Sequence, residues 1–256
     1  MHTQPSTEHD PLSIRRRSML RLMGAGMVSA GLMTGLAGLG AGRPAWAANS
    51  GPAPLDRPDG AAALARLMAG NLRWAEGRPQ ARDPIPRRAE QAVAQYPIAA
   101  VLSCADSRVA PELAFDQGSG EIFAVRLAGN FANDDGIASL EYAVAVLGVP
   151  LLMVLGHSGC GAVSATIDVI RNGTVLPGQL PGLVDAMRPG IEPVVTQSAG
   201  TLSPAALLAD ATIANVNHTL RDLRGTSPVL SRAIAEGRVA TAGAVYDIAS
   251  GKVTLI

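Results

Sequence analysis

The sequence predicts an α/β protein whose central sheet has four mostly parallel strands plus a C-terminal edge strand, flanked by helices. Short apolar runs at residues 98–103, 122–127 and 151–155 are bounded by polar residues or proline, which is typical of buried strands. Helical patterns separate these runs, so right-handed crossovers should make the strands parallel. Residues 239–248 and 253–256 should form a terminal hairpin that adds the edge strand.

Helices are expected where apolar residues recur at helical spacing between capping and breaking residues. They should cover residues 59–77, 109–116, 134–148, 161–171, 204–224 and 228–236. The stretch from 172 to 203 holds several glycines together with Pro177, Pro181, Pro189 and Pro193. Because proline disrupts helix interiors, we expect a loop here with at most one short helix.

The first 47 residues are typical of an export signal rather than of a folded domain. Arg16 and Arg17 begin a motif that resembles a twin-arginine signal, and an apolar run over 22–42 follows. The small residues of Ala45-Trp46-Ala47 predict cleavage before Ala48. The protein should therefore pass through the twin-arginine translocase and become periplasmic or secreted. An uncleaved membrane anchor is the alternative, because the run approaches spanning length.

The remaining chain should form one domain. Residues 48–58 are rich in proline and are expected to be a linker, and residues 59–256 are long enough for a single core. Within this domain, residues 59–90 should act as an N-terminal helical arm that embraces a second subunit, in a homodimer or a tetramer. A formal net charge of zero and an aromatic content of 3% give no footprint for binding nucleic acid.

The chain has only two cysteines, Cys104 and Cys160, and both follow apolar runs. His157 lies three residues before the second cysteine. Two thiolates and one imidazole suit Zn²⁺ with an open fourth position, which is typical of a catalytic zinc. A disulfide is the alternative in an exported protein. Zinc is favoured because apolar strands lead into both cysteines and because His157 lies close to Cys160. Export after folding also allows the metal to be loaded in the reducing cytosol.

At these residues the sequence resembles the β-class carbonic anhydrases. Cys104-x-Asp106-x-Arg108 followed by His157-x-x-Cys160 is similar to the zinc signature of that family. Further segments are similar as well, and the resemblance covers nearly all of the chain after the export signal. These segments are residues 71–77, 125–130, 139–143 and 156–161.

The resemblance implies reversible hydration of CO₂ to bicarbonate and a proton. Zinc would be held by Cys104, His157 and Cys160, with water or hydroxide in the fourth position. Asp106 would accept the proton of the zinc-bound hydroxide and so orient it, and Arg108 would orient Asp106 and keep it ionised. In the family, this aspartate can also become the fourth zinc ligand in an inactive state at lower pH. Two thiolates weaken the acidification of bound water, so groups around the ligands should matter.

The resemblance also points to a substrate pocket of the plant-like subtype. Gln95 lies nine residues before the first cysteine, where that subtype has a glutamine that bonds CO₂ or bicarbonate. Phe123 and Tyr142 match the pocket aromatics, although core packing is an equal alternative for them. Gly161 is a further candidate substrate-binding residue. Val101 stands where the subtype with a noncatalytic bicarbonate site has tryptophan. In the family the glutamine and one aromatic come from the partner subunit.

Two other functions remain open at this point. A hydrolase of carbonyl sulfide or carbon disulfide would use the same scaffold and zinc chemistry. A noncatalytic zinc- or bicarbonate-binding module would keep Asp106 permanently on the metal. His218, in the predicted helix over 204–224, is expected to be an ordinary packed or exposed histidine, with proton shuttling as the alternative.

Overall fold

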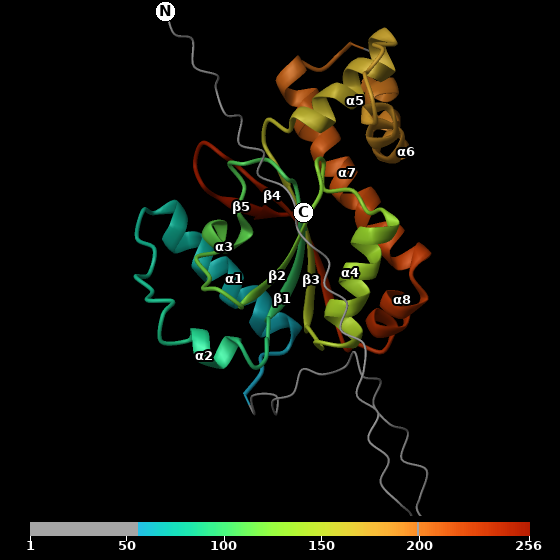
Figure 1. Ribbon diagram of the computed structural model, residues 1–256. Helices are drawn as coiled ribbons and strands as arrows, with labels where there is room; N and C mark the ends of the chain where they lie inside the picture. The colour runs from blue at the N-terminus through green and yellow to red at the C-terminus, as the bar shows by residue number, and fades with distance from the viewer. Residues whose placement is uncertain (1–55, 199) are drawn as a thin grey trace, which may run out of the picture. The chain divides into compact units, whose positions relative to one another are not determined.

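The computed structural model describes residues 56–198 and 200–256 (Figure 1). The predicted export signal over 1–47 and nearly all of the predicted linker over 48–58 lie outside the described residues. Among the described residues, no helix is both long enough and apolar enough to cross a membrane.

A five-stranded sheet forms the centre of the domain and confirms the predicted fold class. Its strands are β1 (Ala99–Ser103), β2 (Ile122–Arg126), β3 (Leu151–His157), β4 (Ala240–Tyr246) and β5 (Val253–Leu255). Their order is β2-β1-β3-β4-β5, and every pairing is parallel except that of β4 with β5. The antiparallel β5 is the predicted C-terminal edge strand.

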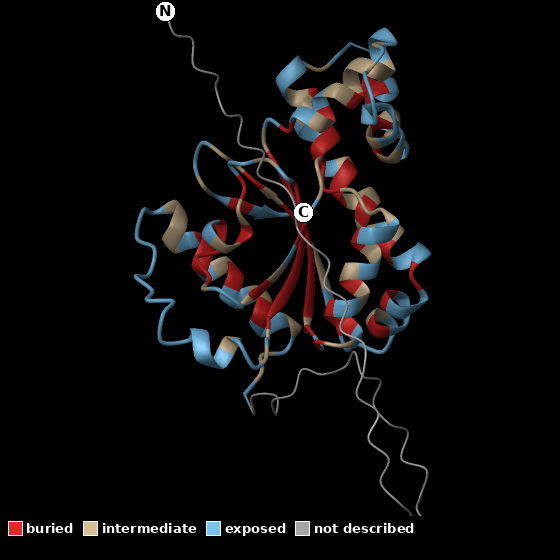
Figure 2. Cartoon of the chain, viewed as in Figure 1, coloured by how far each residue is buried: buried red, intermediate tan, exposed pale blue. Residues whose placement is uncertain are grey.

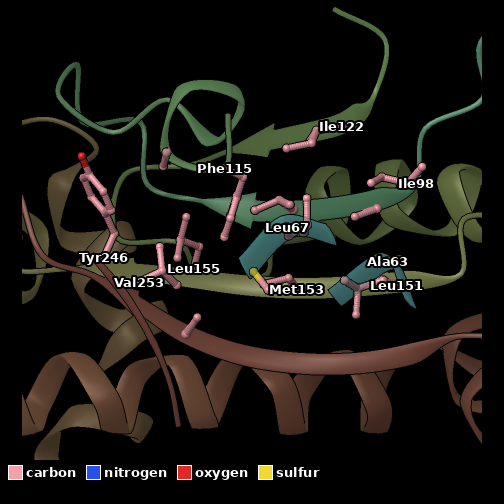
Figure 3. Packing of buried hydrophobic residues seen from close by; sticks show 14 of the residues in the cluster. Ala63, Leu67, Ile98, Phe115, Ile122, Leu151, Met153, Leu155, Tyr246 and Val253 are labelled. Carbon is pink, nitrogen blue, oxygen red and sulfur yellow. The ribbon is translucent and has the colours of Figure 1, made fainter. Parts of the chain in front are cut away.

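Helices cover both faces of the sheet, which explains why every residue of β1 and β3 is buried (Figure 2). The helices are α1 (Gly60–Ala75), α2 (Arg88–Gln91), α3 (Pro111–Ala114), α4 (Asp134–Ala145), α5 (Gly161–Asn172), α6 (Leu180–Ser198), α7 (Pro204–Thr226) and α8 (Pro228–Ala235). On one face α1 and α3 enclose a core that includes Leu67, Phe115 and Met153 (Figure 3). On the other face α4, α7 and α8 pack over Leu102 and Val154.

The expectation of a loop over 172–203 is wrong, because α6 is a long helix with Pro189 and Pro193 inside it. Residues Val184, Met187, Ile191 and Val195 recur at helical spacing and are buried against α5 and α7. Both prolines lie on the exposed side. The carbonyl groups they leave without a helical donor can therefore bond water, and burial of the opposite face offsets the cost of proline.

The expected dimerisation arm over residues 59–90 begins with α1, and most of the apolar face of this helix is already covered within its own chain. Ala63 and Leu67 are fully buried against the sheet of their own chain, so these apolar positions need no partner subunit to cover them. The amide of Asn71 further ties α1 to the carbonyl groups of Ala114 and Gly251. Leu72, in contrast, is 57% exposed.

The segment after α1 is attached to the domain through Asp116. This buried carboxylate accepts hydrogen bonds from Arg73 at 2.6 Å, from the Gln80 amide at 3.2 Å, and from Arg82. Burial opposes ionisation, but the hydrogen bonds from Arg82 and Arg73 outweigh it and hold the pKa of Asp116 below its ordinary value. The charge of Asp116 should therefore stabilise the fold.

Asp116→Asn should lower the free energy of unfolding by about 2 kcal/mol at neutral pH, because the guanidinium groups lose their carboxylate. The native pKa lies below that of the unfolded chain. The contribution is thus complete above about pH 4 and is lost as the pH falls through the native pKa. Denaturant titrations should show the variant and the wild type converging in acid. Asp185→Asn, on the exposed side of α6, is the control. An equal gap at neutral and acid pH would contradict the assignment.

Candidate metal centre

The parallel pairing of β1 with β3 brings the predicted ligands together at one edge of the sheet. Ser103, the last residue of β1, pairs with Leu155 of β3, so Cys104 and His157 leave the sheet side by side. Carboxyl ends of parallel strands are the usual place for sites in such folds. A turn through Gly159, with a left-handed φ of 68°, then leads to Cys160 at the start of α5.

The candidate ligand atoms of Cys104, His157 and Cys160 lie within 4.8 Å of one another, and all three residues are buried. The two cysteines are free thiols, so the structure does not form the disulfide alternative. Two sulfurs and an imidazole nitrogen are a donor set that Zn²⁺ prefers.

The imidazole of His157 is arranged as a metal ligand would be. Its Nδ1 lies 3.0 Å from the carbonyl oxygen of Ser158, so Nδ1 carries the proton and Nε2 has the free lone pair. Nε2 is buried and has no hydrogen-bond partner among the described residues. Leaving a buried nitrogen without a partner is costly, and a metal ion would satisfy it. The residues present therefore fit a zinc ion.

The two thiols shift the pKa values of each other in opposite directions. The pKa of Cys104 is lowered to about 4, chiefly because Cys160 donates a hydrogen bond to its sulfur, and the Gly129 amide donates another. The pKa of Cys160 is raised, because its proton stabilises the neighbouring thiolate and because it is buried. A bound divalent cation would displace that remaining proton and make both sulfurs thiolates.

Asp106 and Arg108 form a two-pronged ion pair beside the ligands. Oδ1 of Asp106 accepts from Arg108 Nε at 2.9 Å and from the Arg108 amide at 2.9 Å, and Oδ2 accepts from Nη2 at 2.7 Å. These bonds hold the pKa of Asp106 well below its ordinary range. Oδ2 also lies 3.9 Å from Nε2 of His157, which places the carboxylate at the edge of the centre.

Arg126 fixes the loop that carries Cys104 and Asp106, a role that sequence reasoning did not assign. Its Nε donates to the carbonyl of Cys104 at 3.1 Å and its Nη2 to the carbonyl of Asp106 at 2.7 Å. Arg126 belongs to one of the segments that carry the family resemblance. Its position at the end of β2, the neighbour of β1, was the available signal.

Within one chain, three of the predicted substrate residues lie away from this centre. Gln95 precedes β1 whereas Cys104 follows it, so the strand separates them by roughly 17 Å. Phe123 and Tyr142 contact each other, with ring centroids 6.2 Å apart, at the outer edge formed by β2 and α4. Gly161, by contrast, directly follows Cys160 at the first turn of α5 and has open space where a side chain would be.

His218 is a packed helix histidine. Its Nε2 lies 3.2 Å from Oδ2 of Asp222 one turn away, and its ring packs on Gly190 of α6. These contacts agree with the ordinary role expected for it.

A doubly covered, mostly parallel sheet with a buried Cys-His-Cys group at its carboxyl edge defines an α/β protein with a candidate zinc site. The family model described as carbonic anhydrase matches residues 99–253. The carbonic anhydrase of Mycolicibacterium smegmatis is 40% identical over 195 residues, which are 76% of this chain and 92% of that protein. The chain belongs to the β-class carbonic anhydrases.

Solved structures agree with this assignment. The Coccomyxa β-carbonic anhydrase, solved with acetazolamide, is 26% identical with a TM-score of 0.58, covering 75% of this chain and 86% of that one. A tetrameric β-carbonic anhydrase of Sordaria macrospora has a TM-score of 0.61 at 21% identity, covering 75% of this chain and 96% of that one. The latter likeness concerns the fold alone.

Cys160→Ala should abolish stoichiometric zinc binding, because two ligands cannot hold the ion against solvent. Metal analysis of purified protein should give about one zinc per wild-type chain and almost none for the variant. Ser164→Ala, one turn further along α5 and exposed, should keep its zinc. Full zinc occupancy in Cys160→Ala would show that this cysteine is not a ligand.

Proposed function

We propose that the protein catalyses CO₂ + H₂O ⇌ HCO₃⁻ + H⁺ with one zinc ion held by Cys104, His157 and Cys160. The observation that carries the proposal is the buried ligand group with its unpartnered Nε2, directly beside a carboxylate that Arg108 holds. When bound, zinc supplies a Lewis acid that lowers the pKa of a coordinated water toward neutrality.

The residues around the metal then direct the nucleophile. Asp106 remains ionised because Arg108 donates to both of its oxygens, and an ionised carboxylate is an obligate acceptor. By accepting a hydrogen bond from the attacking oxygen, Asp106 would leave a lone pair of that oxygen free to face CO₂. Arg108 is the positioning residue, because its fork fixes the plane of the carboxylate.

The state of Asp106 favours an enzyme over a noncatalytic module. A module with a closed site would use this carboxylate as the fourth ligand, which requires it to turn away from Arg108. Here both carboxylate oxygens accept from Arg108 instead. The sulfur analogues of CO₂ would undergo the same chemistry. Parallel assays of CO₂ hydration and sulfide release on one sample would separate these substrates.

The substrate pocket is that of the plant-like subtype and is completed by a second copy of the chain. Gln95 and Phe123 lie too far from the centre of their own chain, so they would serve the site of the partner. Over residues 56–198 and 200–256, no strand lies beyond β2 at its edge of the sheet, and unpaired edges require cover. Leu72 and Leu113, each 57% exposed, add apolar surface on α1 and α3. A homodimer is the smallest such unit, and a tetramer would contain it.

The protein is exported in folded form, with zinc in place, to the periplasm or beyond. The proposal of export is supported by Arg16 and Arg17, by the apolar run over 22–42 and by the predicted cleavage site at Ala45-Trp46-Ala47. N-terminal sequencing of protein from the cell envelope should find Ala48 first. An intact N-terminus in the membrane fraction would indicate an anchor instead.

Asp106→Asn should keep zinc but lower kcat/KM for CO₂ hydration by about 100-fold or more, because an amide cannot replace the charged acceptor. Stopped-flow assays with metal analysis on the same sample would measure both. Asp135→Asn, at the exposed start of α4, is the matched control. Wild-type rates for Asp106→Asn across the pH range would remove its orienting role.

Gln95→Ala should lower turnover by about tenfold without loss of zinc, since one hydrogen bond to substrate disappears. The decisive sample is a mixed dimer of Gln95→Ala and Asp106→Asn chains. If Gln95 serves the site of its partner, both substitutions fall in the same site of the mixed dimer, and the other site has neither. The mixed dimer should then be more active than either variant alone. The exposed Gln197→Ala should behave as wild type. Mixing without recovery would place Gln95 elsewhere.

A further inference from the structure

The sulfur of Cys104 has a hydrogen-bond donor besides its fellow ligands. The backbone amide of Gly129 donates to Sγ of Cys104 at 3.3 Å, and this contact is buried. The carbonyl oxygen of the same glycine accepts a hydrogen bond from Nδ2 of Asn215 at 2.8 Å, also buried. A side chain on α7 is therefore connected to a metal ligand through one glycine.

Gly129 is held in a conformation that other residues would not adopt easily. Its φ is 84°, in the left-handed region, and a Cβ here would lie 2.3 Å from Sδ of Met187 and 3.2 Å from Cβ of Ala162. The glycine is thus enclosed between α6 and α5. The remaining freedom of its carbonyl group is restricted by Asn215.

The position of α7 relative to the metal centre is fixed by the residue that follows Asn215. A Cβ on Gly156 would lie 2.8 Å from Cγ2 of Val216, so helix and strand are in close contact immediately before His157. Asn215 is 1% exposed. Burying a side-chain amide costs free energy unless the amide forms a hydrogen bond. Nδ2 of Asn215 forms its hydrogen bond with Gly129, which contacts the Cys104 sulfur.

We propose that Asn215 is a positioning residue for the metal centre, acting through Gly129 on the thiolate of Cys104. This proposal rests on the proposed function, since the Cys104 thiolate is taken as a zinc ligand. By holding Gly129, Asn215 keeps the amide hydrogen on Sγ, and that hydrogen bond withdraws negative charge from the sulfur. Two thiolates would otherwise reduce the Lewis acidity of the metal, so this contact helps to preserve it.

Asn215→Leu tests the proposal, because it removes the donor while keeping a side chain branched at the same carbon. Asn215→Ala is a second variant that adds no bulk. Thr219→Val is the matched control, since Thr219 is buried one turn along α7 and its hydroxyl has no partner among the described residues. Each full-length variant would be purified with zinc and, separately, with Co²⁺. The readouts are the zinc dissociation constant and the thiolate-to-Co²⁺ charge-transfer band.

The expected result is a zinc dissociation constant about tenfold higher for the Asn215 variants, with the charge-transfer band at longer wavelength. Thr219→Val should match the wild type in both readouts. An unchanged band in a folded Asn215 variant, whatever its zinc affinity, would overturn the proposal and make Asn215 a packing residue. A wild-type chain that takes up no zinc would instead refute the proposed function.

Discussion

The register between β1 and β3 is the constraint on which the rest of the structure depends. With Ser103 opposite Leu155, the residues that follow the two strands emerge at the same edge. A slip of one residue would turn Cys104 or His157 to the opposite face of the sheet. Both strands are buried on both faces, so this register is enforced by core packing rather than by the ligands themselves. The centre is thus preorganised before any metal arrives.

A cap formed by α5, α6 and α7 converts this strand edge into a buried site. Met187 and Ile191 of α6 and Ala211 of α7 belong to the same apolar cluster as Cys104 and Cys160. Low polarity around two sulfurs strengthens their attraction for a cation and also strengthens each hydrogen bond they accept. Asp106 and Arg108 lie on a partly open side of the centre, where Asp106 is half-buried and Arg108 is exposed. The residues proposed to orient the nucleophile therefore lie on the solvent side, and the hydrogen bonds proposed to tune the sulfur lie on the buried side.

Local sequence signals were sufficient to predict the sheet and the candidate ligand group. The first three strands are short apolar runs with clear boundaries. Of the candidate ligands, Cys104 directly follows β1, His157 is the last residue of β3 and Cys160 lies three residues further along. The helix α6 was missed because Pro189 and Pro193 dominate its local signal, whereas its stability comes from burial against two other helices. Propensity is a weak prior that such packing overrides.

Other parts of the site could not be predicted from local patterns, because they depend on contacts between distant segments. Asn215 looks like an ordinary helix residue until α7 is seen beside Gly129, some 86 residues earlier in the chain. Arg126 gains its role only from the pairing of β2 with β1. Gln95 shows the opposite case, since its own chain places it at the end of β1 away from Cys104. The role proposed for it therefore needs a second copy of the chain.

X-ray absorption at the zinc edge of the purified wild-type protein tests the central claim most directly. The account predicts two sulfur neighbours at about 2.3 Å, one imidazole nitrogen at about 2.0–2.1 Å and one further light atom. Zinc surrounded only by oxygen and nitrogen would contradict it. So would metal-free protein with its two sulfurs joined at about 2.05 Å.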